Sequence, residues 1–193
     1  YVACMNKHIP QVLLDGSKDL ELVQRLIGIY QPEYIWTPTD RVQEVSEGFK
    51  VVYEYATYSL LETGFTTQAI SPELLLCLTT SGSTGSPKLV RLSERNLRSN
   101  AESIAEYLHI NENERPVTSL PMYYSYGMSV INSHLIKGAT ILLTDKAVMQ
   151  REFWSFIKEQ KATSIAGVPY TYEMLKRLRF FRMDLPELKT MIQ

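Results

Sequence analysis

The chain has 193 residues, of which 45% are hydrophobic, and its 20 basic and 21 acidic side chains give a net charge of −1. This length is enough for one or two domains with a hydrophobic core. The near-neutral charge argues against general binding to nucleic acid or to a membrane surface. No stretch approaches the roughly 18 apolar residues of a membrane helix, and the N-terminus has no signal-peptide pattern. We therefore expect a cytoplasmic location, with no nucleic-acid and no membrane partner.

The first part of the chain predicts short strands and one helix. An apolar run over 12–14 predicts a buried strand, and apolar residues at helical spacing over 22–30 predict a helix that Pro32 ends. Residues 34–36 predict a second strand. The stretch 50–61 is rich in Val, Tyr and Thr, so it predicts strands that could pair as a hairpin.

The second part of the chain alternates between strands and helices. Residues 89–92 predict a short strand, and Ser93 predicts the cap of a helix with an apolar stripe over 97–108. The polar stretch 111–115 is the best candidate for a domain boundary. Strands are then predicted at 117–120, 140–143, 164–166 and near 189–192, and helices at 126–136, 151–160 and 172–179. This alternation favours an α/β fold, in which helices cover parallel sheets.

The segment 79–88, TTSGSTGSPK, is the most informative part of the sequence. It combines two glycines, six hydroxyl side chains and one lysine directly after the apolar run 74–78. Glycine lets the backbone turn sharply, and backbone N–H groups in such a turn can bind an anion. The hydroxyl groups add donors, and Lys88 adds a positive charge. The segment is therefore predicted to bind polyphosphate.

Known glycine-rich motifs do not fit this segment. A Walker A loop has lysine directly after its second glycine, whereas Ser86 and Pro87 separate Gly85 from Lys88. The dinucleotide-binding pattern G-x-G-x-x-G is also absent. A flexible polar linker stays open as an alternative, although linkers need neither a preceding apolar strand nor a terminal Pro-Lys.

The string T-S-G-S-T-G-x-P-K at 80–88 resembles the phosphate-binding signature of the adenylate-forming (AMP-binding) enzymes. This superfamily includes acyl- and aryl-CoA ligases, peptide-synthetase adenylation domains and luciferases. Further landmarks that resemble the family are Leu92-Ser93 with Asn96, the run LPMYY at 120–124 followed by Gly127, Lys137-Gly138-Ala139 and Gly167-Val168-Pro169. The resemblance covers essentially the whole chain, although residues before Ser71 match in pattern only.

The resemblance implies parts of two stacked α/β subdomains with mainly parallel sheets, residues 1–112 with the phosphate-binding segment and residues 113–193. It implies an internal fragment of the family's large N-terminal domain, because a later Tyr-Gly-x-Thr-Glu motif, a ribose-binding aspartate and a late lysine do not occur. The parent would be an AMP-forming acid–thiol ligase, similar to the acyl-CoA synthetases of fatty acid metabolism. It would convert a carboxylic acid and ATP into an acyl-adenylate and pyrophosphate, and pass the acyl group to CoA or to the phosphopantetheine thiol of a carrier protein. We expect the fragment alone to be inactive.

The resemblance also implies roles for individual residues. The candidates for binding the ATP phosphates are Thr80, Ser81, Gly82, Ser83, Thr84, Gly85 and Lys88, and the catalytic candidates among them are Thr84 and Lys88. Tyr123 and Tyr124 are candidates for the acyl pocket, with packing between subdomains as an equal alternative; Tyr124 replaces a frequent histidine. Mg²⁺ is expected as a cofactor of the parent. The histidines have no ligand spacing, so this chain is expected to supply no metal site of its own.

Two other interpretations remain. The first is a non-catalytic nucleotide-binding or interaction module. Such a module would also have a phosphate-binding segment, and it would not need the family's later Tyr-Gly-x-Thr-Glu motif, ribose-binding aspartate or late lysine. The basic run Lys176, Arg177, Arg179 and Arg182 could meet an acidic partner or a cofactor phosphate, although a solvated helix face is favoured.

Overall fold

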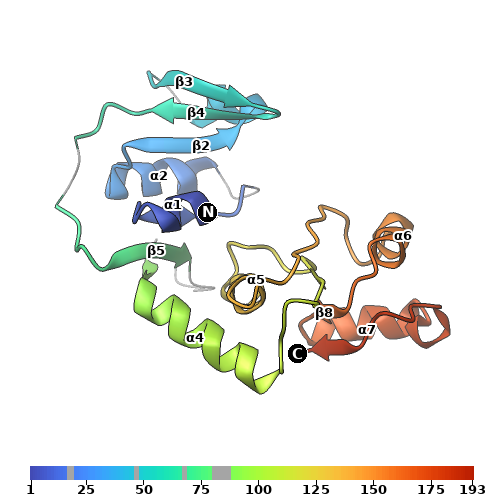
Figure 1. Ribbon diagram of the computed structural model, residues 1–193. Coiled ribbons are helices and arrows are strands. Elements are labelled where there is room, and N and C mark those ends of the chain that lie inside the picture. Colours follow the sequence, from blue (N-terminus) through green and yellow to red (C-terminus); the bar gives the residue numbers. More distant parts are fainter. Residues whose placement is uncertain (17–19, 46–47, 67–68, 80–87) are drawn as a thin grey trace. The chain divides into compact units, whose positions relative to one another are not determined.

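The computed structural model describes residues 1–16, 20–45, 48–66, 69–79 and 88–193 (Figure 1). The chain forms two compact units, Tyr1–Arg91 and Leu92–Gln193. Each unit has helices and strands of its own, so the predicted α/β character is confirmed. No helix in the described ranges is long and apolar enough to cross a membrane.

The first unit contains a sheet with strand order β1-β5-β6. Its strands are β1 (Gln11–Leu13), β5 (Leu74–Thr79) and β6 (Leu89–Ser93). β1 runs parallel to β5, with Leu13 opposite Leu78. Four consecutive residues of β5, 75–78, are buried, which is typical of a strand covered on both faces. One of them is Cys77, and burial raises the pKa of its thiol.

A second sheet in this unit is antiparallel, with strand order β2-β4-β3. Its strands are β2 (Tyr34–Pro38), β3 (Lys50–Tyr55) and β4 (Tyr58–Glu62). The hairpin considered for 50–61 is confirmed, so the expectation of mainly parallel sheets does not extend to this part of the chain. The helices of the unit are α1 (Val2–Asn6), α2 (Leu20–Tyr30), the 3-10 helix η1 (Thr39–Arg41) and α3 (Val42–Val45).

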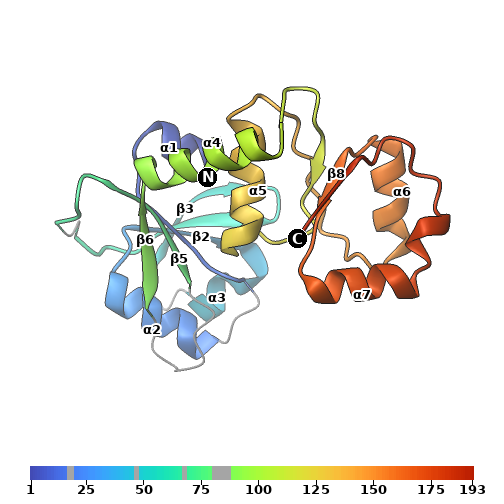
Figure 2. The same ribbon diagram turned by 90° about the horizontal axis from the view of Figure 1, so that it is seen from below.

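The second unit begins with two long helices that pack on each other, α4 (Glu94–Tyr107) and α5 (Ser125–Leu135) (Figure 2). Ser93 caps α4 as predicted. Its hydroxyl accepts from the Asn96 backbone N–H at 3.2 Å, while the Ser93 N–H donates to the Asn96 side chain at 3.0 Å. This reciprocal pair fixes where α4 starts.

A parallel sheet forms the other half of this unit, with strand order β7-β8-β9. Its strands are β7 (Pro116–Val117), β8 (Ser164–Ala166) and β9 (Thr190–Ile192), and the accompanying helices are α6 (Arg151–Glu159), α7 (Pro169–Arg177) and the 3-10 helix η2 (Phe180–Arg182). The core joins Val117, Leu142 and Ile165 to Phe153 and Ile157 of α6. The strand predicted at 140–143 is reduced to a single bridge between Leu142 and Val117, because it lies at the edge of the sheet and Leu143 is 73% exposed.

The division between the units lies before α4, because α4 packs on α5. The subdomain boundary expected after residue 112 follows a different criterion, the change from one sheet to the next. The assignment of 1–112 and 113–193 as subdomains stays a prediction.

The start of α5 depends on Gly127. A Cβ atom at this position would lie 2.2 Å from the Pro121 carbonyl oxygen and 2.9 Å from that of Leu120. Both contacts are to backbone, which cannot rotate away. Glycine is therefore the residue that lets α5 approach the segment 120–121.

His134 is a second constraint in α5. Its ring is buried, and Nδ1 donates to the Val130 carbonyl oxygen at 2.8 Å, so Nδ1 carries the hydrogen. Burial lowers the pKa of His134, an effect opposed by its hydrogen bond to Val130 and by the charge of Glu114. The folded unit therefore holds this imidazole neutral.

We expect Gly127→Ala to destabilise the chain by at least about 2 kcal/mol, because the methyl group forces backbone apart. Gly28 is the matched control. It lies in α2 with open space around the position of a Cβ atom, so Gly28→Ala should stabilise by roughly 0.5–1 kcal/mol through helix propensity. Urea unfolding monitored by circular dichroism measures both changes. Equal effects of the two substitutions would contradict the close approach at Gly127.

We expect the second unit to lose stability as the pH falls below about 6.5. The unfolded imidazole takes up a proton near that pH, whereas the folded one does so only at lower pH, so acid favours unfolding. His134→Asn keeps a donor toward Val130 and should remove this part of the pH dependence. The fluorescence of Trp154 during urea unfolding, in a Trp36→Phe background, measures it. An unchanged pH slope in the Asn variant would refute the role of His134.

Candidate functional site

The predicted phosphate-binding segment joins two neighbouring strands. β5 ends at Thr79, β6 begins at Leu89, and the two strands are adjacent in the sheet. Thr80, Ser81, Gly82, Ser83, Thr84 and Gly85 lie outside the described residues. The described strands show that the segment starts at the carboxyl end of a buried central strand, which is where ligands bind in open α/β sheets.

Lys88 is the one predicted phosphate-binding residue that the structure describes. It is exposed, directly before β6. Among the described residues it has no ion-pair partner. Its ammonium group is therefore available to an anion.

A second cation lies at the same end of the sheet. Because β1 is parallel to β5, the turn after β1 lies at the carboxyl edge where β5 also ends. Arg41 donates from its guanidinium to the Gly16 carbonyl oxygen of this turn, and its Nε donates to Glu44 Oε2 at 3.0 Å. No sequence pattern indicated Arg41, since its partner Gly16 is remote along the chain.

The predicted acyl-pocket residues lie at the start of α5, in the second unit. Tyr124 is the N-cap residue of α5 and is exposed, whereas Tyr123 is half-buried. The rings of Tyr124 and Tyr126 meet edge to face, with centroids 6.4 Å apart. The structure thus places one of the two predicted tyrosines, Tyr124, beside a third tyrosine that the sequence analysis did not select.

The Tyr126 hydroxyl is buried and has no hydrogen-bond partner in the part of the chain that the structure describes. Burial raises the pKa of Tyr126, and the nearby hydroxyls of Tyr172 and Tyr124 raise it further. Tyr172 itself donates to the Ile192 carbonyl oxygen at 2.7 Å. A buried hydroxyl without a partner is costly, so this tyrosine cluster (Tyr124, Tyr126 and Tyr172) has an unused donor. Tyr126 was not among the predicted site residues, because no sequence pattern shows that its hydroxyl lacks a hydrogen-bond partner among the described residues.

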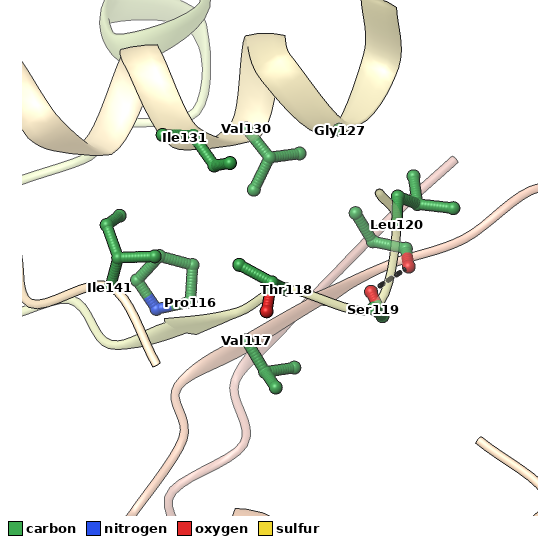
Figure 3. Close-up of a pocket in the computed structure, with 10 residues that line it drawn as sticks. Pro116, Val117, Thr118, Ser119, Leu120, Gly127, Val130, Ile131 and Ile141 are labelled. Carbon is green, nitrogen blue, oxygen red and sulfur yellow. Dashed lines mark hydrogen bonds between the residues drawn. The ribbon is translucent and has the colours of Figure 1, made fainter. Parts of the chain in front are cut away.

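The cavity between α5 and β7 is a separate feature (Figure 3). It is lined by Pro116, Val117 and Thr118 on one side and by Gly127, Val130 and Ile131 on the other. Its volume is only about 10 Å³. Beside it, the Ser119 hydroxyl donates to the Ala166 carbonyl oxygen at 2.5 Å. It is too small for an organic acid, and neither predicted tyrosine lines it.

The described ranges offer no group of three His, Cys, Asp or Glu side chains that could hold a metal ion. Lys88 belongs to the first unit, whereas Tyr123 and Tyr124 belong to the second.

The chain is similar to a known family and to several known proteins. The family model "AMP-binding enzyme" matches residues 11–192. Feruloyl-CoA synthase from an Amycolatopsis species is 27% identical over 122 residues, which are 62% of this chain and 25% of that protein. 2-Succinylbenzoate–CoA ligase from Staphylococcus aureus is 28% identical over 134 residues, 69% of this chain and 26% of that protein. The chain thus spans about a quarter of the length of these curated relatives.

Solved structures show the same fold. o-Succinylbenzoate CoA synthetase from Bacillus subtilis, in complex with its acyl-adenylate intermediate, superposes with a TM-score of 0.71 at 19% identity and covers 98% of this chain and 50% of that one. The adenylation domain AlmE from Vibrio cholerae, in complex with glycyl-adenosine-5'-phosphate, superposes with a TM-score of 0.69 at 18% identity. The match covers 92% of this chain and 39% of that one. The family model spans nearly the whole sequence, and the chain therefore belongs to the AMP-binding enzyme family.

Proposed function

We propose that this chain is part of a ligase that activates a carboxylic acid as its acyl-adenylate, releases pyrophosphate, and transfers the acyl group to CoA or to a carrier-protein thiol. The observation that carries the proposal is the segment T-S-G-S-T-G-x-P-K between the adjacent strands β5 and β6 in a member of the AMP-binding family. The names of the relatives, which are CoA synthases and ligases, support it.

The chemistry of adenylation explains why such a segment is needed. The carboxylate is an anion that must attack the α-phosphate of a polyanion, and negative charge grows on the departing pyrophosphate. Catalysis then depends on positioning and on donors and cations that face the leaving group. Backbone N–H groups and hydroxyls of residues 80–85, with Thr84 as a donor and Lys88 as a cation, would supply them. The exposed ammonium of Lys88 fits this role.

ATP fits the residues present better than Mg²⁺ does. Lys88 has no competing ion pair among the described residues, as a phosphate ligand requires. For the metal, the described ranges contain no cluster of carboxylates. We therefore propose ATP and a thiol acceptor as substrates of the full-length enzyme and derive no step through Mg²⁺.

The tyrosine cluster would face the acid. Aromatic rings give a rigid apolar wall, and a hydroxyl adds one polar contact. Tyr124 is exposed at the N-terminus of α5, and the hydroxyl of Tyr126 lacks a partner among the described residues. That hydroxyl is buried, so a polar substituent of the acid would satisfy it if binding of the acid moves the side chains that cover it. The cluster therefore favours an acid with a hydrogen-bonding group over a plain hydrocarbon chain.

We expect Lys88→Ala to slow ATP–pyrophosphate exchange by about 10- to 100-fold in the full-length enzyme, because a charged donor to the leaving group is worth roughly 1.5–3 kcal/mol. Thr84→Ala should slow it as well, with a smaller loss for a neutral donor. Lys88→Arg should recover part of the rate. Lys137→Ala, which removes an exposed lysine in the second unit, is the control. Exchange at the wild-type rate in both Lys88→Ala and Thr84→Ala would refute the proposed role of the segment.

We expect Tyr126→Phe to change selectivity among acids rather than the exchange chemistry itself. Loss of the hydroxyl should reduce kcat/KM about tenfold or more for an acid that hydrogen-bonds to it, and leave a purely hydrocarbon acid unchanged. Steady-state kinetics with such a matched pair of acids measures this. Tyr107→Phe is the control, because Tyr107 on α4 is 83% exposed. A parallel loss for both acids would argue against contact between Tyr126 and the acid.

A further inference from the structure

A groove on the second unit is separate from the tyrosine cluster. Its volume is about 450 Å³, and residues of helix α6 and of the segment that follows α7 line it. From α6 come Arg151, Trp154, Ser155 and Lys158, which are spaced to lie on one face of a helix. The opposite face of α6 carries Phe153 and Ile157 into the core, so the groove face is the outer face of the helix.

The groove has an apolar interior that combines one fixed side chain with two flexible ones. Trp154 is held in place, since its Nε1 donates to the Val148 carbonyl oxygen at 2.8 Å and its ring meets that of Phe180 at 5.7 Å. Met149 and Met183 complete the interior. Methionine is flexible and polarizable, and it is common where a surface must adapt to a partner's side chains.

The rim of the groove is basic. Arg151 has no ion pair among the described residues, whereas Lys158 pairs with Asp184 at 2.7 Å. Counting these three side chains, the rim has one net positive charge. The ion pair joins α6 to the opposite wall.

The basic run beside the groove extends this charge. Lys176, Arg177, Arg179 and Arg182 flank Leu178 and Met183, which line the groove, and the stretch 176–182 contains no acidic residue. Lys176 and Arg177 lie in the last turn of α7, where their charges complement the helix dipole. That account does not cover Arg179 and Arg182, which lie beyond the helix. Phe181 stands between them and is 88% exposed.

We propose that this groove binds an acidic amphipathic helix of a partner protein. Apolar side chains at i, i+3 or i+4, and i+7 of such a helix would enter between Trp154 and the methionines, and its carboxylates would face Arg151 and the basic run. A small ligand would leave Phe181 and the arginines beyond the groove without a role. A flat bilayer could reach Phe181 but could not fill a concave groove.

The test uses the 193-residue chain. The probe is a fluorescein-labelled helical peptide of about 20 residues, with leucine at the spacing above and glutamate on the other face. Fluorescence anisotropy should give a Kd on the order of 10 μM that weakens with added salt. Arg151→Glu should weaken binding about tenfold or more. Lys137→Glu, a reversal of equal charge away from the groove, should leave it within about twofold.

Ser155→Trp separates groove occupancy from simple charge attraction. Ser155 is exposed on α6 and lines the groove, so this substitution fills the groove without changing net charge or the core, and it should abolish binding. Circular dichroism verifies that each variant is folded. The proposal is overturned if the acidic peptide does not bind, if a lysine-faced peptide binds as well, if Ser155→Trp retains affinity, or if vesicles containing anionic lipid bind in its place.

Discussion

The burial of β5 on both faces is the constraint on which the first unit depends. A strand with four consecutive buried residues has to lie inside its sheet, with β1 on one side and β6 on the other. Its carboxyl end is therefore an interior position. Whatever follows Thr79 along the chain begins at the edge where parallel strands end, with Arg41 bonded to the turn after β1 at that same edge. The segment predicted to bind polyphosphate therefore follows a strand that cannot shift in register without exposing residues 75–78.

The second unit depends on a contact of the opposite kind, the close approach of backbone to backbone at Gly127. Because no Cβ atom intervenes, α5 begins directly on residues 120–121, and its first turn sets the position of Tyr124 and Tyr126. Near the end of the same helix the buried, neutral His134 is satisfied within α5, through its hydrogen bond to the Val130 carbonyl oxygen one turn earlier. Tyr124 and Tyr126 are therefore carried by the first turn of α5, whereas Tyr172 comes from α7.

Local signals in the sequence were sufficient where one residue decides the structure. Ser93 with Asn96 fixed the start of α4, and the apolar run before the glycine-rich segment identified β5 as a buried strand. Prediction from the sequence failed where contacts with residues remote in the chain decide the local structure. Whether residues 140–143 form a strand depends on a neighbouring strand on the outer side, and the structure pairs only Leu142. The bond from Arg41 to Gly16 joins residues far apart in the chain. Among the described residues the Tyr126 hydroxyl lacks a partner because of the tertiary structure around it, and periodicity predicts neither feature.

The net charge of −1 also hides how charge is distributed. A chain-wide average excludes a strong long-range field, but recognition depends on charges within about a Debye length, roughly 8–10 Å in physiological salt. Within the stretch 176–182 the local charge is strongly positive, while acidic side chains elsewhere cancel it in the sum. In the described ranges none of the four basic side chains of this stretch forms an ion pair; they are Lys176, Arg177, Arg179 and Arg182. Cations that the fold leaves unneutralised beside an apolar groove can meet carboxylates without first breaking an ion pair within the chain, although both partners still lose hydration. The near-neutral composition is thus compatible with one basic, partner-binding face, and the position of the charges, not their sum, carries that information.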